Sequence, residues 1–220
     1  MSRFHTLKAG LLALLIVAGF TVQGKPAHAA ETETIIVAGG CFWCVESDFE
    51  RVTGVIDVIS GYASGTLLDA TYTKDTNKRS GRYEAVQIKF DPNLVTRAQL
   101  YHLYFRSIDP TDAGGQFCDR GETYRTAIFV QDDAQSKEAV AAKHEAQSAL
   151  GRDIVTRVIR AKTFSKAQSH HQDYYKGSNL VVTRFGTIKQ SDAYKRYRKG
   201  CGRDARVQQL WGKNAPFVSH

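Results

Sequence analysis

The chain has 220 residues, enough for one domain and too few for two large ones. Hydrophobic residues make up 42% and charged residues 24%, as in soluble globular proteins, which excludes intrinsic disorder, a collagen repeat and a multi-pass membrane protein. The formal net charge is +8, and four cysteines are too few for a disulfide-stapled scaffold but enough for a redox centre or one metal site.

The first residues have the three parts of a secretory signal. Arg3 and Lys8 give a positive start, an apolar run extends from 9 to 22, and Ala27-His28-Ala29 has the spacing of a cleavage site. We therefore expect residues 1–29 to be removed. Because cleavage removes three cations and no acid, the net charge would fall from +8 to +5.

The mature chain is expected to be a single domain at 30–220, with a core at about 34–162 and a wrapped tail at about 163–220. The apolar run is short against the roughly 20 residues of a spanning helix. We therefore expect an exported, periplasmic protein that acts as a monomer and has no stable association with the membrane after cleavage.

Apolar patterns and turn signals predict the elements of the core. In chain order they are a strand at 35–38, a helix at 42–52, strands at 55–62 and 84–90, a helix from Thr96, a strand at 124–130, a helix from Asp132 or Asp133 to Gly151, and a short strand at 155–159. This order is the split βαβ pattern of ferredoxin-like α+β domains. After Phe164 the pattern is irregular, which predicts a tail wrapped over the domain.

Two of these helices carry clear terminal signals. Thr96 followed by Gln99 is a capping box. The later helix is capped by an aspartate, stops at Gly151 and is expected to bury one alanine face. That face comprises Ala139, Ala142, Ala146 and Ala149.

The motif Gly40-Cys41-Phe42-Trp43-Cys44 lies where the first strand turns into the first helix. A cysteine there faces unpaired backbone N–H groups and the positive end of the helix dipole, which favour a thiolate. Cys41 is therefore the best candidate nucleophile, although free cysteine is also a common small buried residue. No metal site is expected, because Cys118 and Cys201 stand alone rather than in a second paired motif. A thioredoxin-like fold is disfavoured by the order of the elements.

Basic residues gather near the carboxyl end of the chain. They are Lys189, Lys195, Arg196, Arg198, Lys199, Arg203, Arg206 and Lys213. Such a run is usually a solvated face, and export argues further against a nucleic-acid partner.

Several motifs in this order closely resemble the A-type peptide methionine sulfoxide reductases, from about residue 34 to the end. They are Gly40-Cys41-Phe42-Trp43-Cys44-Val45-Glu46, Gly61-Tyr62, Ala70-Thr71-Tyr72, Gly81-Arg82-Tyr83-Glu84-Ala85-Val86, Phe90-Asp91-Pro92, Asp109-Pro110-Thr111, Gln116-Phe117-Cys118-Asp119-Arg120-Gly121, Tyr124-Arg125-Thr126-Ala127-Ile128 and His171-Gln172-Asp173-Tyr174. The resemblance implies reduction of methionine-S-sulfoxide, in proteins or free. In this reaction Cys41 attacks sulfur, methionine leaves and a cysteine sulfenic acid remains.

The oxygen of the sulfoxide leaves as hydroxide or water, so an acid is needed beside it. Glu84 has the strand parity of Val86, Ile88 and Phe90, and is therefore expected to point to the apolar side, where desolvation keeps a carboxyl group protonated.

The resemblance also implies roles for five further residues. Tyr72 and Tyr124 are expected to bond the sulfoxide oxygen, and Asp119 to lie beside the same pocket. Phe42 and Trp43 are expected to form an aromatic cage for the substrate methyl group.

A second cysteine must clear the sulfenic acid by forming a disulfide, which a thioredoxin-like dithiol then reduces. Cys44, Cys118 and Cys201 compete for this role. We favour Cys201, because it lies between two glycines in a tail predicted to be flexible and has basic neighbours. Cys44 is the alternative, because it is nearest in sequence.

The sequence contains no metal, flavin or nicotinamide motif, and no cofactor is expected. The alternative function that we weigh is general thiol–disulfide exchange of the thioredoxin type, and a non-catalytic binding module ranks third.

Overall fold

The computed structural model describes residues 31–63 and 81–218. The predicted signal segment, residues 1–29, and Tyr72 lie outside the described residues. The described residues from Thr32 onward form one compact unit. Within the described ranges, no helix combines the length and the apolar character that a membrane span requires.

The main elements follow one another along the chain as β1 (Glu33–Gly39), α2 (Phe42–Phe49), β2 (Val55–Ala63), β3 (Tyr83–Phe90), α4 (Arg97–Arg106), β4 (Gly115–Gln116), β5 (Asp119–Arg120), β6 (Thr126–Val130), α5 (Asp133–Leu150), β7 (Arg157–Arg160), β8 (Phe164–Lys166), β9 (Leu180–Thr183), β10 (Gly186–Lys189), α6 (Gln190–Cys201) and α7 (Arg203–Trp211). Short 3-10 turns lie at Glu122–Tyr124, Ser169–His171, Tyr174–Lys176 and Gly212–Asn214.

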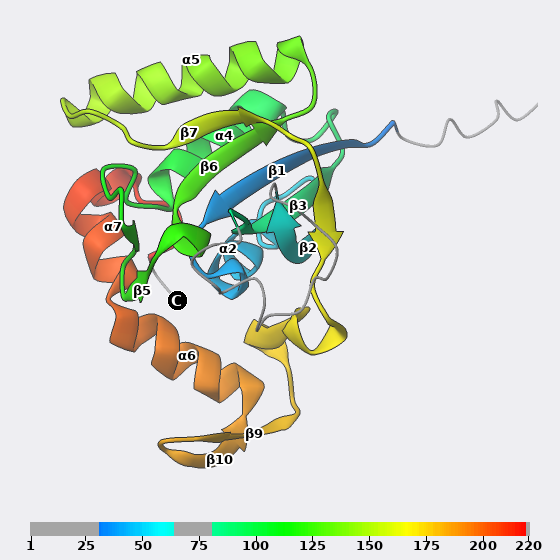
Figure 1. Ribbon diagram of the computed structural model, residues 1–220, viewed down its shortest axis with the longest axis vertical. Coiled ribbons are helices and arrows are strands. Elements are labelled where there is room, and N and C mark those ends of the chain that lie inside the picture. Colours follow the sequence, from blue (N-terminus) through cyan, green and yellow to red (C-terminus); the bar gives the residue numbers. More distant parts are fainter. Residues whose placement is uncertain (1–30, 64–80, 219–220) are drawn as a thin grey trace, which may run out of the picture. The chain divides into compact units, whose positions relative to one another are not determined.

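Six strands form one mixed sheet in the order β7-β6-β1-β3-β2-β8 (Figure 1). All neighbouring pairs are antiparallel except β6 with β7. Because side chains alternate along a strand, the sheet has two apolar faces. The larger core contains Ile35 and Val37 together with residues of α2, α4, α5 and α7. Ile36 and Ala38 belong to a smaller cluster with Phe164. The predicted α+β class is confirmed.

The local signals in the core act as expected. Thr96 and Gln99 form the reciprocal capping box of α4. Asp132 accepts a hydrogen bond from the backbone of Gln135 at the start of α5. Gly151 ends this helix in the left-handed conformation, with φ of 61°. The alanine face is buried as predicted except for Ala149, which lies in the last turn of α5 and is exposed.

Tyr124 does not begin a strand, contrary to the sequence prediction. It ends the 3-10 turn Glu122–Tyr124, and β6 starts only at Thr126. The turn follows Gly121, whose φ of 121° is unfavourable for residues with a side chain. The reversal ahead of β6 places Tyr124 beside the sheet rather than within it.

The prediction of an irregular tail after Phe164 is wrong. Strand β8 pairs with β2, the hairpin β9–β10 follows, and two helices complete the chain. The buried face of α6 is formed by Gln190, Tyr194 and Arg198. These residues have helical spacing, but two of the three are polar, so an apolar pattern does not reveal the helix.

Candidate active site

Cys41 lies at the junction of β1 and α2, as the glycine pair ahead of it suggested. It is the N-cap residue of α2, and its side chain makes no capping hydrogen bond. Gly40 has φ of 82°, and a Cβ there would lie 2.6 Å from the Cβ of Gln116. Only glycine fits this turn, because a side chain would meet both a strained backbone and a neighbouring residue.

A cavity of about 50 Å³ opens beside Cys41. Its lining residues are Cys41, Phe42, Trp43, Glu84, Asp119, Tyr124 and Tyr197. All of these except Tyr197 were predicted from the sequence as site residues. The predicted six come from three separate segments of the chain, and α6 contributes Tyr197. A volume of this size accommodates only a small group, such as the sulfur end of a side chain.

Glu84 is the second residue of β3, and its side chain points into the apolar side of the sheet, as its parity predicted. The residue is 1% exposed. Its Oε2 accepts a hydrogen bond from the backbone N–H of Phe42 at 3.2 Å. The same bond satisfies one of the free N–H groups in the first turn of α2. The carboxyl group of Glu84 is therefore fixed next to the residue that follows Cys41.

The two cysteines of α2 have opposite pKa shifts. Burial, followed by a hydrogen bond to Cys44, raises the pKa of the Cys41 thiol well above its ordinary value. The hydrogen bond from Cys41 lowers the pKa of Cys44, and the charges of Arg203 and Arg198 act in the same direction. The resting protein therefore favours the thiol form of Cys41 rather than the expected thiolate, because burial and the contact with Cys44 raise its pKa.

Tyr197 is a site residue that the sequence analysis missed. Its hydroxyl group donates to Oδ2 of Asp119, across 78 positions in the sequence. Burial raises the pKa of Asp119, and burial together with the negative field of Cys41 raises that of Tyr197. A helical stripe of Tyr194 with Tyr197, at the spacing i and i+3, is the only sequence signal for this position.

Aromatic rings close the site over Phe42 and Trp43. The ring of Trp43 stacks on Tyr174 at 3.9 Å with planes 10° apart. The ring of His171 lies 5.3 Å from that of Phe42. Burial, with a smaller contribution from His170, lowers the pKa of His171 to about 4, so this imidazole is neutral at physiological pH. Through these ring contacts, His171 and Tyr174 of the motif His171-Gln172-Asp173-Tyr174 form part of the site.

Cys118 and Cys201 form a disulfide with Cα atoms 4.8 Å apart, whereas Cys41 and Cys44 are free and buried. The predicted partner of Cys201 was Cys41, so this state of the protein contains a different pair. The disulfide lines a second cavity of about 510 Å³, and Trp43 and Tyr197 form part of the wall of both cavities. The redox disulfide and the Cys41 pocket are therefore neighbours.

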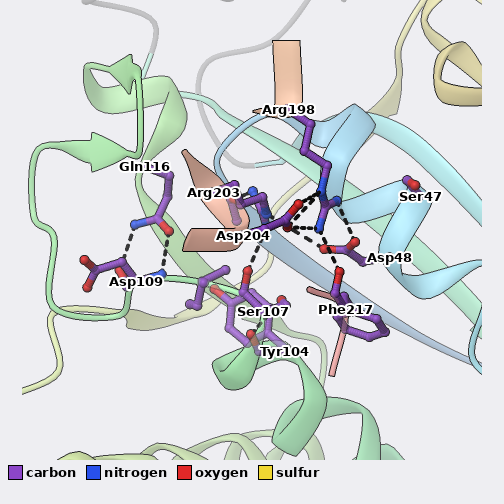
Figure 2. A network of polar contacts seen from close by, with 12 residues as sticks. Ser47, Asp48, Tyr104, Ser107, Asp109, Gln116, Arg198, Arg203, Asp204 and Phe217 are labelled. Carbon is purple, nitrogen blue, oxygen red and sulfur yellow. Dashed lines mark hydrogen bonds and ion pairs between the residues drawn. The ribbon is translucent and has the colours of Figure 1, made fainter. Parts of the chain in front are cut away.

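The setting of Cys201 corrects the prediction of a flexible tail. It is the last residue of α6, and Gly202 joins this helix to α7 with φ of 70°. On either side, Arg198 and Arg203 are buried. Arg198 bonds Asp48 at 2.7 Å, and Arg203 donates to the carbonyl groups of Gly39 and Ser107 (Figure 2). The sequence could not reveal these anchors, because their partners lie about 100 or more positions away.

Among the described residues, two groups of side chains have donor atoms close enough to hold a metal ion. The first consists of Cys118, Asp119 and Cys201, but its two sulfur atoms are joined in the disulfide and offer no thiolate. The second consists of Glu46, Glu50 and Asp173, and Lys176 already binds Glu50 at 2.6 Å and Asp173 at 2.9 Å. Neither group fits a resident cation in this state.

The sequence and the fold both match known proteins. The family model for peptide methionine sulfoxide reductase matches residues 33–214. Peptide methionine sulfoxide reductase MsrA 2 of Rhizobium meliloti is 46% identical over 89% of this chain and 92% of its own length. Its namesake in Caulobacter vibrioides is 44% identical over 91% of this chain and 98% of its own length.

Two solved structures have the same fold. Reduced Mxr1 from Saccharomyces cerevisiae has a TM-score of 0.65 and 28% identity, covering 73% of this chain and 94% of that one. Methionine sulfoxide reductase A of Corynebacterium diphtheriae has a TM-score of 0.61 and 27% identity, covering 71% and 77%. Together with the cavity beside Cys41, these matches establish that the chain belongs to the peptide methionine sulfoxide reductase family, oxidoreductases that return methionine sulfoxide to methionine with electrons from thiols.

Proposed function

We propose that this reductase acts on methionine-S-sulfoxide, with Cys41 as the nucleophile and Glu84 as the acid. The observation that carries the proposal is the small cavity that both residues line at the start of α2. A general thiol–disulfide exchanger is not favoured, because both the family model and the curated relatives are methionine sulfoxide reductases.

The first step transfers oxygen from the substrate to sulfur of the enzyme. Glu84 donates a proton to the sulfoxide oxygen while sulfur of Cys41 attacks the sulfoxide, and the thiol proton of Cys41 passes to the Glu84 carboxylate. Methionine leaves, and Cys41 becomes a sulfenic acid. Phe42 and Trp43 contact the S-methyl group and exclude water, while Tyr124 and Asp119 face the oxygen. Tyr72, which lies outside the described residues, keeps its predicted role as a second phenol donor.

We infer that Cys44 closes the first disulfide. Its sulfur lies in hydrogen-bonding contact with Cys41, and its pKa is lowered, which favours the attacking thiolate. Condensation gives a Cys41–Cys44 disulfide and water. Cys201, the resolving residue predicted from the sequence, then attacks Cys44 and releases Cys41. Cys118 next attacks Cys201 and releases Cys44, which produces the disulfide that the structure contains.

The remaining electrons come from outside the chain. We infer that a thioredoxin-like dithiol reduces the Cys118–Cys201 disulfide. The pattern of residues 1–29 supports export to the periplasm, where the mature protein acts as a monomer.

We also infer a ferredoxin-like core. Four strands in the order β6-β1-β3-β2, with α2 and α4 as the two crossover helices, support the split βαβ description.

The activity is tested with the two enantiomers of methyl p-tolyl sulfoxide and with dithiothreitol as reductant. We expect consumption of the S form alone. Equal consumption of both enantiomers would contradict the stereochemical proposal, and reduction of insulin without sulfoxide turnover would favour the exchanger.

The order of the cysteines is tested by disulfide mapping. Reduced Cys201→Ser, Cys44→Ser and wild-type proteins are treated with methionine sulfoxide in the absence of reductant and mapped by mass spectrometry. We expect a Cys41–Cys44 bond in Cys201→Ser and a Cys118–Cys201 bond in the wild type. A Cys41–Cys201 bond in Cys44→Ser, together with normal turnover of that variant, would make Cys201 the direct resolver.

A further inference from the structure

The Cys118–Cys201 disulfide lies in a groove that the proposed chemistry at Cys41 does not use. The groove, of about 510 Å³, lies between the β9–β10 hairpin and α6. Figure 1 shows the hairpin packed beside the first turns of α6. Cys118 is exposed and Cys201 is half-buried, so a sulfur of the disulfide is open to attack from the groove.

The hairpin next to the groove exposes an unusual amount of apolar surface. Leu180 is 69% exposed, Val182 87% and Phe185 50%. These are three of the seven large apolar side chains that the described part of the chain exposes, and they fall within six consecutive positions. Such a concentration is typical of a surface that binds another protein.

The charged side chains that line the groove are both cationic. The guanidinium groups of Arg184 and Arg196 lie 4.8 Å and 4.9 Å from the centre of the Phe185 ring. No aspartate or glutamate lines this groove among the described residues. Two cations around an exposed aromatic ring complement a partner that presents an apolar surface with an acidic edge.

We propose that this groove is the docking site of the protein dithiol that regenerates the enzyme. The partner is a reductant whose reactive cysteine is surrounded by apolar residues with acidic side chains at the edge. The proposal rests on the proposed function, because the Cys118–Cys201 disulfide must carry the oxidation that leaves Cys41. It adds where the reductant binds and which residues it contacts.

The exchange is balanced by the two thiols of the partner. A thiolate of the reductant attacks Sγ of Cys118, the Cys118–Cys201 bond breaks, and Cys201 leaves as a thiolate that takes up a proton. The second thiol of the reductant then attacks the mixed disulfide and releases Cys118. The enzyme gains two electrons, and the partner becomes a disulfide.

An oxidised substrate polypeptide is the main competing occupant, because Trp43 and Tyr197 border both cavities. The disulfide favours the reductant, since a substrate needs access to Cys41 and has no reaction with Cys118. A second copy of this chain is a further competitor. Kinetics with two reductants and two substrates, together with sedimentation, separate these three possibilities.

The test compares Phe185→Ala and the double variant Arg184→Glu/Arg196→Glu with wild type. We expect the KM for thioredoxin to rise about tenfold in each variant, the effect of losing one anchor residue. With saturating dithiothreitol, kcat and the KM for both free and peptide-bound methionine sulfoxide should stay at the wild-type values. Leu94→Ala, at another exposed apolar position, and Arg157→Glu, at another exposed cation, serve as matched controls.

Trapping identifies the attacked sulfur. A thioredoxin whose second active-site cysteine is replaced by serine should form a mixed disulfide with Cys118 in wild type, and less of it with Phe185→Ala. An unchanged KM for thioredoxin in both groove variants would overturn the proposal. So would a raised KM for peptide substrate in dithiothreitol, or a dimer in sedimentation that Phe185→Ala dissociates. Absence of sulfoxide turnover by the wild type in dithiothreitol would instead overturn the proposed function.

Discussion

The surroundings of Cys41 and of the Cys118–Cys201 disulfide differ in size, burial and charge. Cys41 is 6% exposed beside a cavity of about 50 Å³ that two acids line. The disulfide lies in a groove of about 510 Å³ with an exposed sulfur and two arginines. Reduction of a sulfoxide needs a dry pocket with a held proton, whereas reduction by a protein needs an open surface. The difference indicates that the enzyme separates these two requirements in space.

Replacing the buried nucleophile should have the largest effect. Cys41→Ser is expected to lower single-turnover release of methionine by at least about 10³, because serine is a far weaker nucleophile at sulfur. The Cys118–Cys201 disulfide of this variant should still form with a chemical oxidant and be reduced by thioredoxin at the wild-type rate. Rapid methionine release by Cys41→Ser would assign the nucleophile elsewhere.

Replacing the acid of the same cavity should have the next largest effect. Glu84→Gln keeps the hydrogen bond from Phe42 and removes only the transferable proton, so we expect single-turnover methionine release to fall by roughly 10² to 10⁴. Far-UV circular dichroism and the thermal midpoint check that folding is unchanged. A loss of less than about fivefold, below the usual worth of a general acid, would contradict the role of Glu84.

Much of this buried region follows from local sequence. Glu84 was assigned from strand parity, and Cys41 from a glycine pair ahead of a helix, because both signals act over a few residues. Tyr197 could not be assigned in this way, since α6 reaches Asp119 only through the tertiary fold.

The region around the Cys118–Cys201 disulfide was also predicted less well, because its contacts form only through the tertiary fold. The buried face of α6 is polar and includes Tyr194 and Arg198. The guanidinium group of Arg198 forms ion pairs with Asp48 and Asp204. No hydrophobic period indicates such a helix, so the sequence suggested a loose tail. Apolar periodicity detects helices that bury hydrocarbon and misses those held by buried ion pairs.

Removing one cysteine of the Cys118–Cys201 disulfide should leave the chemistry at Cys41 intact. We expect Cys118→Ser to release methionine at the wild-type rate in a single turnover and to lose about tenfold or more in thioredoxin-supported steady-state turnover, because the terminal disulfide cannot form. The two rates are measured on the same preparation by rapid quench and by NADPH consumption with thioredoxin reductase. A slower single turnover would mean that Cys118 acts within the Cys41 pocket.

The smallest expected effect on turnover concerns a second buried carboxyl group, Glu46 on α2, which we expect to act on stability. It is 1% exposed, and its Oε1 accepts a hydrogen bond from the backbone N–H of Asp173 at 3.1 Å, next to the tyrosine that stacks on Trp43. Burial, with the negative charges of Glu50 and Asp173, raises the pKa of Glu46 from 4.5 to about 8.

Between these two pH values the folded protein holds a proton that the unfolded chain has lost. The free energy of unfolding should therefore fall as pH rises through this window, by up to about 1.4 kcal/mol per pH unit, and level off above the folded pKa. Glu46→Gln stays neutral and keeps an acceptor for the Asp173 N–H, so its stability should lack this slope and exceed that of wild type at the alkaline end.

Urea unfolding across the window, with the disulfide intact, measures both curves. Glu31→Gln changes an exposed carboxyl group and serves as the control. A slope that persists in Glu46→Gln would place the titrating group elsewhere in the fold.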